Sequence, residues 1–152
     1  MAILYFEDFS VGQVFELGTV GPLAEDEIIA FGRQFDPQPF HVDPEAAKAS
    51  IYGGLIASGW QTALHTMRVT VDSLLSRTDA QGSPGVENIR FRKPVRAGQR
   101  FVVRYTVLAA EPSTKRPSLG KILGRQELVD ADGDVVYSAD GWGLVGRRPP
   151  GA

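Results

Sequence analysis

The amino-acid sequence predicts one α+β domain over residues 1–152, because helical spacing of apolar residues marks its first half and strand-like composition its second. A chain of this length can bury enough surface for one hydrophobic core, and it leaves no room for a second full domain. The strongest helical pattern runs from Leu55 to about Leu75, and four strand-like segments follow it. This order predicts a long central helix wrapped by an antiparallel β-sheet.

Two shorter helices are predicted before the long one. The first covers Ala24–Phe35, with acidic residues in its first turn, where the helix dipole favours negative charge. The prolines of Asp36-Pro37-Gln38-Pro39 end it. A second helix through Ala49 is expected to begin after Asp43, since Asp is a favoured N-cap and Pro44 suits the first helical position.

The long helix has apolar residues at every third or fourth position. They are Ile56, Trp60, Ala63 or Leu64, Met67, Val71 and Leu74. Packing in the core is the expected role of this face, including Trp60 and Met67, and lining a tunnel for a ligand is the alternative. His65, among the interleaved polar residues, is expected to be structural.

The second half of the chain is predicted to form strands. The predicted strands are Glu87–Arg92, Arg100–Leu108, Lys121–Val129 and Val135–Val145. Asp132-Gly133 is a strong turn signal that joins the last two into a hairpin. Glu111–Ser118, which contains two prolines, is expected to be a loop, and Thr19-Val20-Gly21-Pro22 a turn.

Composition excludes several classes of function. With 16 basic and 18 acidic residues, the net charge is −2, unlike the strongly basic surface of a nucleic-acid-binding domain. Because there is no cysteine, disulfides, thiolate metal sites and cysteine nucleophiles are excluded. The N-terminus lacks the basic start of a secretory signal, and no apolar run reaches the roughly 18–20 residues of a membrane span. We therefore expect a cytoplasmic protein without nucleic-acid or membrane partners.

Asp36 and His41 are the first candidates for catalysis. They lie five residues apart in a segment stiffened by prolines, and together a carboxylate and an imidazole can activate water and deliver a proton. The alternatives are a capping Asp and a packed His. A metal site made of Asp36, His41 and Asp43 is less favoured, because zinc sites normally use more His or Cys, so no metal is expected.

The segment Gly53-Gly54-Leu55-Ile56-Ala57-Ser58-Gly59-Trp60 is the second candidate. Glycines let a ligand approach the backbone, and free N–H groups at a helix start suit an oxyanion or a phosphate. The alternative is a turn used only for tight packing. With Asp36 and His41 it makes a plausible site, in which one part supplies acid and base and the other polarises a carbonyl.

These motifs resemble the MaoC-like dehydratase family, which includes the R-specific enoyl-CoA hydratases. The hydratase motif of that family, an Asp, four residues, a His, any residue and an Asp, is similar to Asp36–Asp43. Its Gly-Gly-(aliphatic)-Ile-Ala-x-Gly stretch is similar to Gly53–Gly59. Tyr5–Gln13 and Phe91–Gly98 are also similar in kind, so the resemblance covers nearly the whole chain, with four matches in the right order.

The resemblance implies a hotdog fold that assembles as a homodimer or higher homo-oligomer. It implies hydration of a trans-2-enoyl thioester to a 3-hydroxyacyl thioester, or the reverse. Asp36 and His41 would hold and activate the water, and the N–H of Gly59 would polarise the thioester carbonyl. The partner would be an acyl-CoA or acyl-carrier-protein thioester, with no cofactor other than the coenzyme A of the substrate.

Four further residues are expected to contact the substrate: Gly54, Ser58, Trp60 and Arg92. Arg92 belongs to the basic run Arg90–Arg96, which either meets the phosphates of coenzyme A or faces solvent. The chain departs from the family pattern at Pro37-Gln38, at Ser58, where hydratases often have His, and at Gln99. These departures leave the substrate open.

Two other functions remain open on the same fold. A water held by an acid can attack the thioester carbonyl, which would make the protein an acyl-CoA thioesterase. A hotdog shell can also bind acyl thioesters without turnover, as a non-catalytic subunit. The His five residues after the Asp favours hydration, because many hotdog thioesterases lack that pairing.

Overall fold

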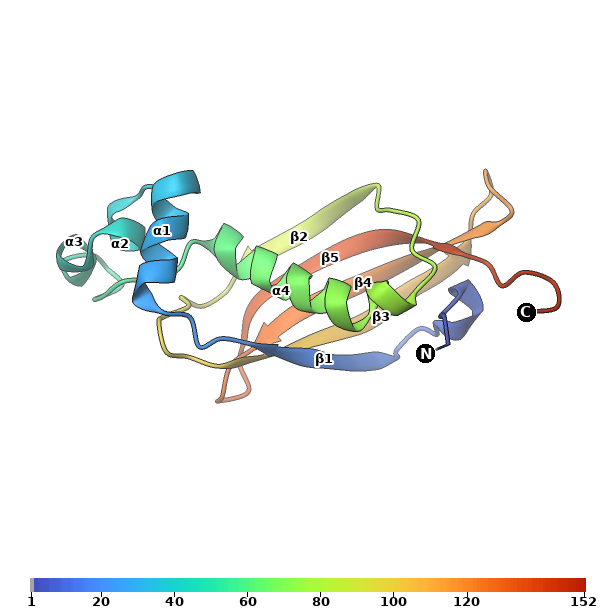
Figure 1. The fold of residues 1–152 in the computed structure, drawn as a ribbon, viewed down its shortest axis with the longest axis horizontal. Coiled ribbons are helices and arrows are strands. Elements are labelled where there is room, and N and C mark those ends of the chain that lie inside the picture. The colour runs from blue at the N-terminus through green and yellow to red at the C-terminus, as the bar shows by residue number, and fades with distance from the viewer. Residues whose placement is uncertain (1) are drawn as a thin grey trace.

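The computed structural model describes residues 2–152 and has the predicted α+β hotdog architecture (Figure 1). A five-stranded antiparallel sheet, in the order β1-β3-β4-β5-β2, carries the long helix α4 on one face. The elements, in chain order, are η1 (Phe6–Asp8), β1 (Val14–Val20), α1 (Glu25–Phe35), α2 (Pro39–Val42), α3 (Pro44–Lys48), α4 (Gly59–Ser73), η2 (Leu75–Arg77), β2 (Gly85–Phe91), β3 (Phe101–Pro112), β4 (Leu119–Val129) and β5 (Val135–Gly146).

The short helices α1, α2 and α3 lie together at one end of the sheet, beyond the start of α4 (Figure 1). The prediction for α1 is confirmed to within one residue. The capping role of Asp43 is also confirmed, because its side chain accepts the N–H groups of Glu45 and Ala46. Between α1 and α3 the chain forms the single-turn helix α2, which carries His41. This helix was not predicted, because the two prolines were expected only to end α1.

Helix α4 begins at Gly59, four residues later than predicted. The preceding segment is extended and is held by two backbone hydrogen bonds to distant parts of the chain. Ile56 N–H donates to the carbonyl of Phe40 (3.0 Å), and Ala57 N–H donates to that of Val95 (2.8 Å). Ser58 then caps the helix by accepting the N–H of Trp60. These contacts fix where the first free N–H of the helix lies.

The fully buried residues of α4 itself are polar, namely Gln61, Thr62, Thr66 and Thr70, which corrects part of the predicted apolar face. Ile56 and Leu74, just before and after the helix, are buried in the core as predicted. The hydroxyls of Thr66 and Thr70 each donate to the carbonyl four residues back, at 2.9 Å, and are thereby satisfied without a partner on the sheet. Trp60 and Met67 are 55% and 40% exposed, so core packing was the wrong expectation for them.

The predicted strands after α4 are confirmed, with shifted ends. β3 continues to Pro112, so the predicted loop shortens to residues 113–118. The turn at Asp132-Gly133 is confirmed: Gly133 has φ 85° and closes the hairpin between β4 and β5. Strand β1 was missed, because only its end, Thr19-Val20, was considered, as part of a turn. It is an edge strand with a bulge between Glu16 and Gly18.

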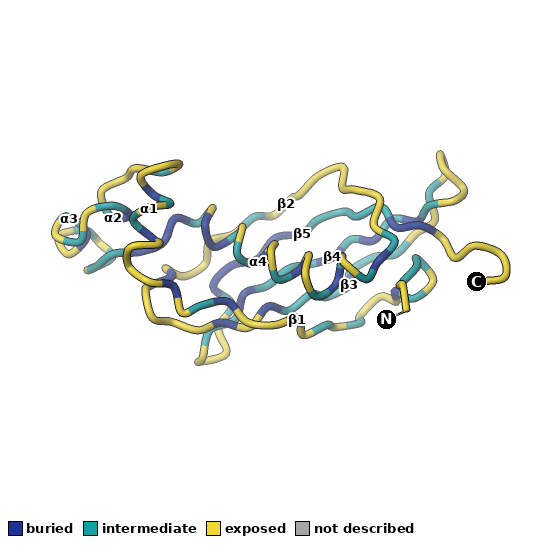
Figure 2. The backbone as a smooth tube through the Cα atoms, viewed as in Figure 1, coloured by how far each residue is buried: buried dark blue, intermediate teal, exposed yellow. Residues whose placement is uncertain are grey.

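The hydrophobic core lies between α4 and the sheet. Buried backbone follows the central strands, whereas β2 is mostly exposed (Figure 2). The fully buried side chains of this core include Phe101, Val103 and Leu128. At the end of the sheet farthest from α1, the two ends of the chain are joined: Glu7 accepts the Nε–H of Arg147 and the backbone N–H of Arg148.

Candidate active site

A pocket of about 490 Å³ lies where α2, the start of α4 and the segment after β2 meet, and its volume is in the range of small-molecule sites. It contains the catalytic candidates Asp36, His41 and Gly59. The remaining lining residues are Gln38, Phe40, Tyr52, Ile56, Ala57, Trp60, Thr62, Phe91, Arg92, Lys93, Pro94, Val95 and Val136. The two motifs singled out in the sequence therefore meet in one cavity.

The imidazole of His41 is buried and held at both nitrogens. Its Nδ1 lies 2.7 Å from the carbonyl oxygen of Ile56. Because a carbonyl can only accept, Nδ1 carries the proton and donates it to this bond. The other nitrogen, Nε2, lies 3.3 Å from Oδ2 of Asp36. In its neutral form the ring therefore presents a lone pair at Nε2 beside a carboxylate, which is the arrangement of a base.

Asp36 follows the last residue of α1, and both of its carboxylate oxygens accept hydrogen bonds. Gln38 Nε2 donates to Oδ1 at 2.7 Å, and Ser58 Oγ donates to Oδ2 at 2.8 Å. Partial burial is the largest single influence on its pKa and raises it, but the bonds from Gln38 and Ser58, together with a positive charge on His41 when that ring is protonated, outweigh burial. The pKa of Asp36 therefore lies below its ordinary value, and the group is an anion at neutral pH.

Gly59 is the first residue of α4, and its N–H has no hydrogen-bond partner within residues 2–152. It stands at the positive end of a helix of 15 residues, where the dipole favours negative charge. The ring of Phe91 packs against it: a Cβ on Gly59 would lie 2.7 Å from two ring carbons. Only glycine fits here while Phe91 keeps its place.

Two of the four residues expected to contact substrate line the pocket, namely Trp60 and Arg92. Ser58 does not. It is completely buried, and its hydroxyl donates to Asp36, whereas its contact with a substrate stays a prediction. Gly54 also lies outside the lining, where a Cβ would meet the guanidinium of Arg96 at 3.3 Å. Gln38, which stood out in the sequence only as a departure from the family pattern, also donates to Asp36, a contact that was not predicted.

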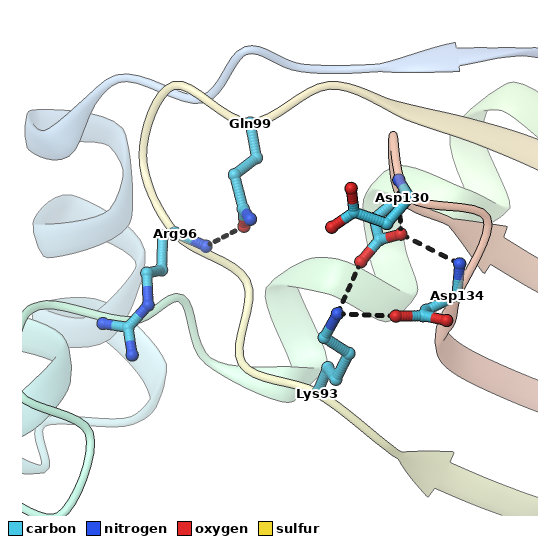
Figure 3. A network of polar contacts seen from close by, with 6 residues as sticks. Lys93, Arg96, Gln99, Asp130 and Asp134 are labelled. Carbon is cyan, nitrogen blue, oxygen red and sulfur yellow. Dashed lines mark hydrogen bonds and ion pairs between the residues drawn. The ribbon is translucent and has the colours of Figure 1, made fainter.

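The segment after β2 is anchored at several points. Lys93 Nζ lies 2.8 Å from Asp130 and 3.0 Å from Asp134, which belong to the turn between β4 and β5 (Figure 3). These two hydrogen bonds raise the pKa of Lys93. Farther along, the N–H of Arg96 donates to the side chain of Gln99 at 2.8 Å. The positive charge of Lys93 is therefore neutralised by the carboxylates of Asp130 and Asp134.

Arg92 has a different environment from Lys93. Its Nε–H donates to Ser138 Oγ on β5 at 3.1 Å, and the residue is exposed at the pocket. The part of the chain that the structure describes contains no cluster of three or more His, Cys, Asp or Glu side chains placed to hold a metal ion. Asp43, the third member of the disfavoured metal site, caps α3 instead. Within the same residues, no helix has the length and apolar character to cross a membrane.

The helix-on-sheet architecture and the pocket at the start of α4 define a hotdog-fold protein. The model of the MaoC like domain family matches residues 8–121, and the chain belongs to that family. The crystal structure of the MaoC-like dehydratase from Rhodospirillum rubrum superposes with a TM-score of 0.87 at 38% identity, over 96% of this chain and 99% of that one.

Two curated relatives have similar sequences over much of their length. The (R)-specific enoyl-CoA hydratase of Rhodospirillum rubrum is 30% identical over 73% of this chain and 74% of its own length. The uncharacterized protein YdeM of Bacillus subtilis is 32% identical, over 75% of this chain and 79% of its own. A Mycobacterium tuberculosis protein with a double hotdog fold matches with a TM-score of 0.78 at 16% identity, which concerns the fold alone.

Proposed function

We propose that this protein adds water to a trans-2-enoyl thioester to give a 3-hydroxyacyl thioester, or catalyses the reverse dehydration. One observation carries the proposal: the Asp36–His41 pair lines the same pocket as Gly59, whose N–H has no hydrogen-bond partner among the described residues. Membership of the MaoC-like family and similarity to an enoyl-CoA hydratase support it. No cofactor is required beyond the coenzyme A or acyl carrier of the substrate.

In this mechanism a water molecule is bound by Nε2 of His41 and the carboxylate of Asp36. As its oxygen bonds to C3 of the substrate, His41 takes one proton, because the carboxylate, with its lowered pKa, is the weaker base. The π electrons of the C2–C3 bond move towards the carbonyl oxygen. The imidazolium, stabilised by Asp36 at 3.3 Å, then returns a proton to C2. One hydroxyl and one hydrogen have been added, and both side chains regain their starting state.

Gly59 acts on the charge that this addition creates. Attack at C3 builds negative charge on the thioester oxygen, and a preformed N–H donor at a helix start stabilises that charge without reorganisation. A single such donor is worth a factor of about 10²–10³ in rate. Gly59 can serve because it makes no other hydrogen bond in the described chain and is the first residue of α4.

The carrier is proposed to enter past Arg92, which keeps free guanidinium N–H groups after bonding Ser138 and can meet a phosphate. A homodimer belongs to the same proposal. Strand β2 forms an edge of the sheet, and a second copy would pair with this unpaired edge. Light scattering that gives only the 16.5 kDa monomer would contradict this part.

The test is hydration of crotonyl-CoA and of a longer trans-2-enoyl-CoA, followed by loss of enoyl absorbance. We expect turnover by the wild type and a fall in kcat of about 10²–10⁴-fold in Asp36→Asn. Asp72→Asn, which removes an exposed pairing with Arg68 on α4, is the matched control and should keep full activity. Release of free thiol from acyl-CoA would instead favour a thioesterase. Tight acyl-CoA binding without turnover, unchanged in Asp36→Asn, would favour a binding subunit.

A further inference from the structure

A second cavity, of about 500 Å³, lies beside the catalytic pocket, between α4 and the strands β2, β4 and β5. Its lining is almost entirely apolar and includes Leu64, Met67, Ile89, Ile122 and Tyr137. A cavity of this size and character suits an aliphatic chain. Neither Asp36 nor His41 reaches it, so it plays no part in the steps described above.

The two cavities share a single lining residue, Trp60. Its ring meets Phe91 edge to face, with the centroids 5.6 Å apart and the planes at 79°. Phe91 in turn stacks on Tyr137, at 6.0 Å and 21°. Phe91 lines only the catalytic pocket and Tyr137 only the second cavity. The three rings therefore form a continuous aromatic partition between the two spaces.

This partition stands directly beside the proposed position of the thioester. Phe91 packs on Gly59, the residue whose N–H faces the carbonyl oxygen in the proposed reaction, and Trp60 is the next residue of α4. An acyl chain that starts at that carbonyl meets the Trp60 and Phe91 rings within a few carbons. The apolar space that would hold the rest of a long chain lies on the other side.

We propose that Trp60 and Phe91 determine the acyl length that this protein accepts, and that in the wild type they restrict it to short chains. This proposal rests on the proposed function and names the substrate class of the same site. Shortening either ring joins the catalytic pocket to the second cavity and admits chains of eight or more carbons. The acyl chain is the occupant that fits, because the joined space is polar at the Asp36–His41 end and apolar beyond the partition.

Both rings can be shortened without opening a hole in the core. Trp60 is 55% exposed and Phe91 50% exposed, so Trp60→Ala and Phe91→Ala remove less packing than substitutions of buried aromatic residues. Phe91→Leu is a milder second variant that still breaks the contact with Trp60. Val71→Ala is the matched control, because Val71 is on the exposed side of α4 but lines neither cavity.

The experiment compares kcat/KM for four-carbon and ten-carbon trans-2-enoyl-CoA. We expect the wild type to prefer the four-carbon substrate. The ten-to-four-carbon ratio should rise at least tenfold in Trp60→Ala and in Phe91→Ala or Phe91→Leu, and stay at the wild-type value in Val71→Ala. A wild type that prefers the ten-carbon substrate would overturn the proposal, as would variants that hydrate both substrates at an unchanged ratio.

A binding measurement keeps the inference testable if no hydration is found, an outcome that would count against the proposed function alone. Dissociation constants of decanoyl-CoA and butyryl-CoA are measured by calorimetry for the same proteins. The partition predicts that Trp60→Ala and Phe91→Ala raise the affinity for decanoyl-CoA at least tenfold relative to the affinity for butyryl-CoA. Equal affinities of wild type and variants for decanoyl-CoA would reject it.

Discussion

The Nδ1 atom of His41 lies 2.7 Å from the carbonyl oxygen of Ile56, and this one bond sets the chemistry of the ring. It fixes the proton on Nδ1 and turns Nε2 towards Asp36. The peptide N–H of Ile56 donates to the carbonyl of Phe40, so α2 and the segment before α4 are joined in both directions. The proposed base, His41, and the proposed oxyanion donor, Gly59, therefore lie on segments that are hydrogen-bonded to each other.

Two substitutions at His41 separate its structural bond from its proposed chemical role. Asn places an amide N–H close to the position of Nδ1, so His41→Asn should keep the bond to Ile56 and fold normally, but it lacks Nε2. We expect kcat/KM for enoyl-CoA to fall by about 10²–10⁴-fold. His41→Gln should instead leave the Ile56 carbonyl unpaired, at a cost of about 1–3 kcal/mol in the free energy of unfolding. An active Asn variant would contradict the proposed base.

Removing Ser58 or Gln38 should move the acid limb of the pH profile of kcat/KM. Both side chains donate to Asp36 and lower its pKa, so Ser58→Ala and Gln38→Ala each raise that pKa. If activity needs the ionised carboxylate, the acid limb shifts to higher pH in both variants. A limb that stays in place in both would show that Asp36 does not have to be ionised.

Ser58→Ala should also destabilise the fold, in a way that depends on pH. Loss of the N-cap of α4 costs about 0.5–2 kcal/mol. The folded-state pKa of Asp36 is depressed, so the stability it contributes is present above its ordinary value and is lost as pH falls through the folded pKa. The difference between wild type and variant in urea unfolding should therefore shrink in acid. Gln38→Ala, which removes no cap, should show only the pH-dependent part.

Lys93→Gln should lower the melting temperature of the protein at neutral pH, and the loss should disappear in acid and in strong alkali. Hydrogen bonds to Asp130 and Asp134 raise the pKa of Lys93, so its contribution is present below the ordinary value of 10.5 and disappears as pH rises through the raised pKa. The pKa of Asp130 is lowered, chiefly by Lys93, so the contribution is also lost as pH falls through that pKa. Thermal denaturation at low and high salt measures this contribution. Asp134→Asn removes only one of the two ion pairs of Lys93 and should therefore lower the melting temperature less. Equal melting temperatures at neutral pH would contradict it.

Thr66→Val should be almost neutral, although Thr66 is completely buried. Its hydroxyl donates to the carbonyl of Thr62, which lies within the helix, and valine keeps the same shape. We expect the free energy of unfolding to change by less than about 1 kcal/mol. Thr66→Ala, which also removes a buried methyl group worth about 0.8 kcal/mol, should cost more. A large loss in the valine variant would mean that the hydroxyl has a partner beyond its own helix.

Local signals in the sequence were sufficient for much of the fold. Three of these signals act within a few residues and can therefore be recognised without a structure. They are the acidic residues of α1, the Asp43-Pro44 cap and the Asp132-Gly133 turn. The start of α4 was misplaced because Ala57 bonds to Val95, a contact between segments far apart in the chain. Strand β1 was missed because its exposed, bulged edge carries no regular alternation.

The candidate site, like the fold, could be predicted from the sequence only in part. The spacing of Asp36 and His41 in a proline-rich segment was enough to pair them, and their distance of 3.3 Å agrees with it. The orientation of His41 depends on the carbonyl of Ile56, and a backbone group leaves no trace in a sequence. The hydrogen bond from Ser58 to Asp36 was not predicted, because it joins residues 22 positions apart that only the folded chain brings together.

The joining of the two chain ends through Glu7, Arg147 and Arg148 has a practical consequence for handling the molecule. Both ends leave the sheet on the side away from α1–α3, the helices next to the pocket (Figure 1). An affinity tag, a fluorophore or a solid support attached at either end would sit far from the pocket mouth. The protein can therefore be immobilised through either terminus with its pocket facing the solution.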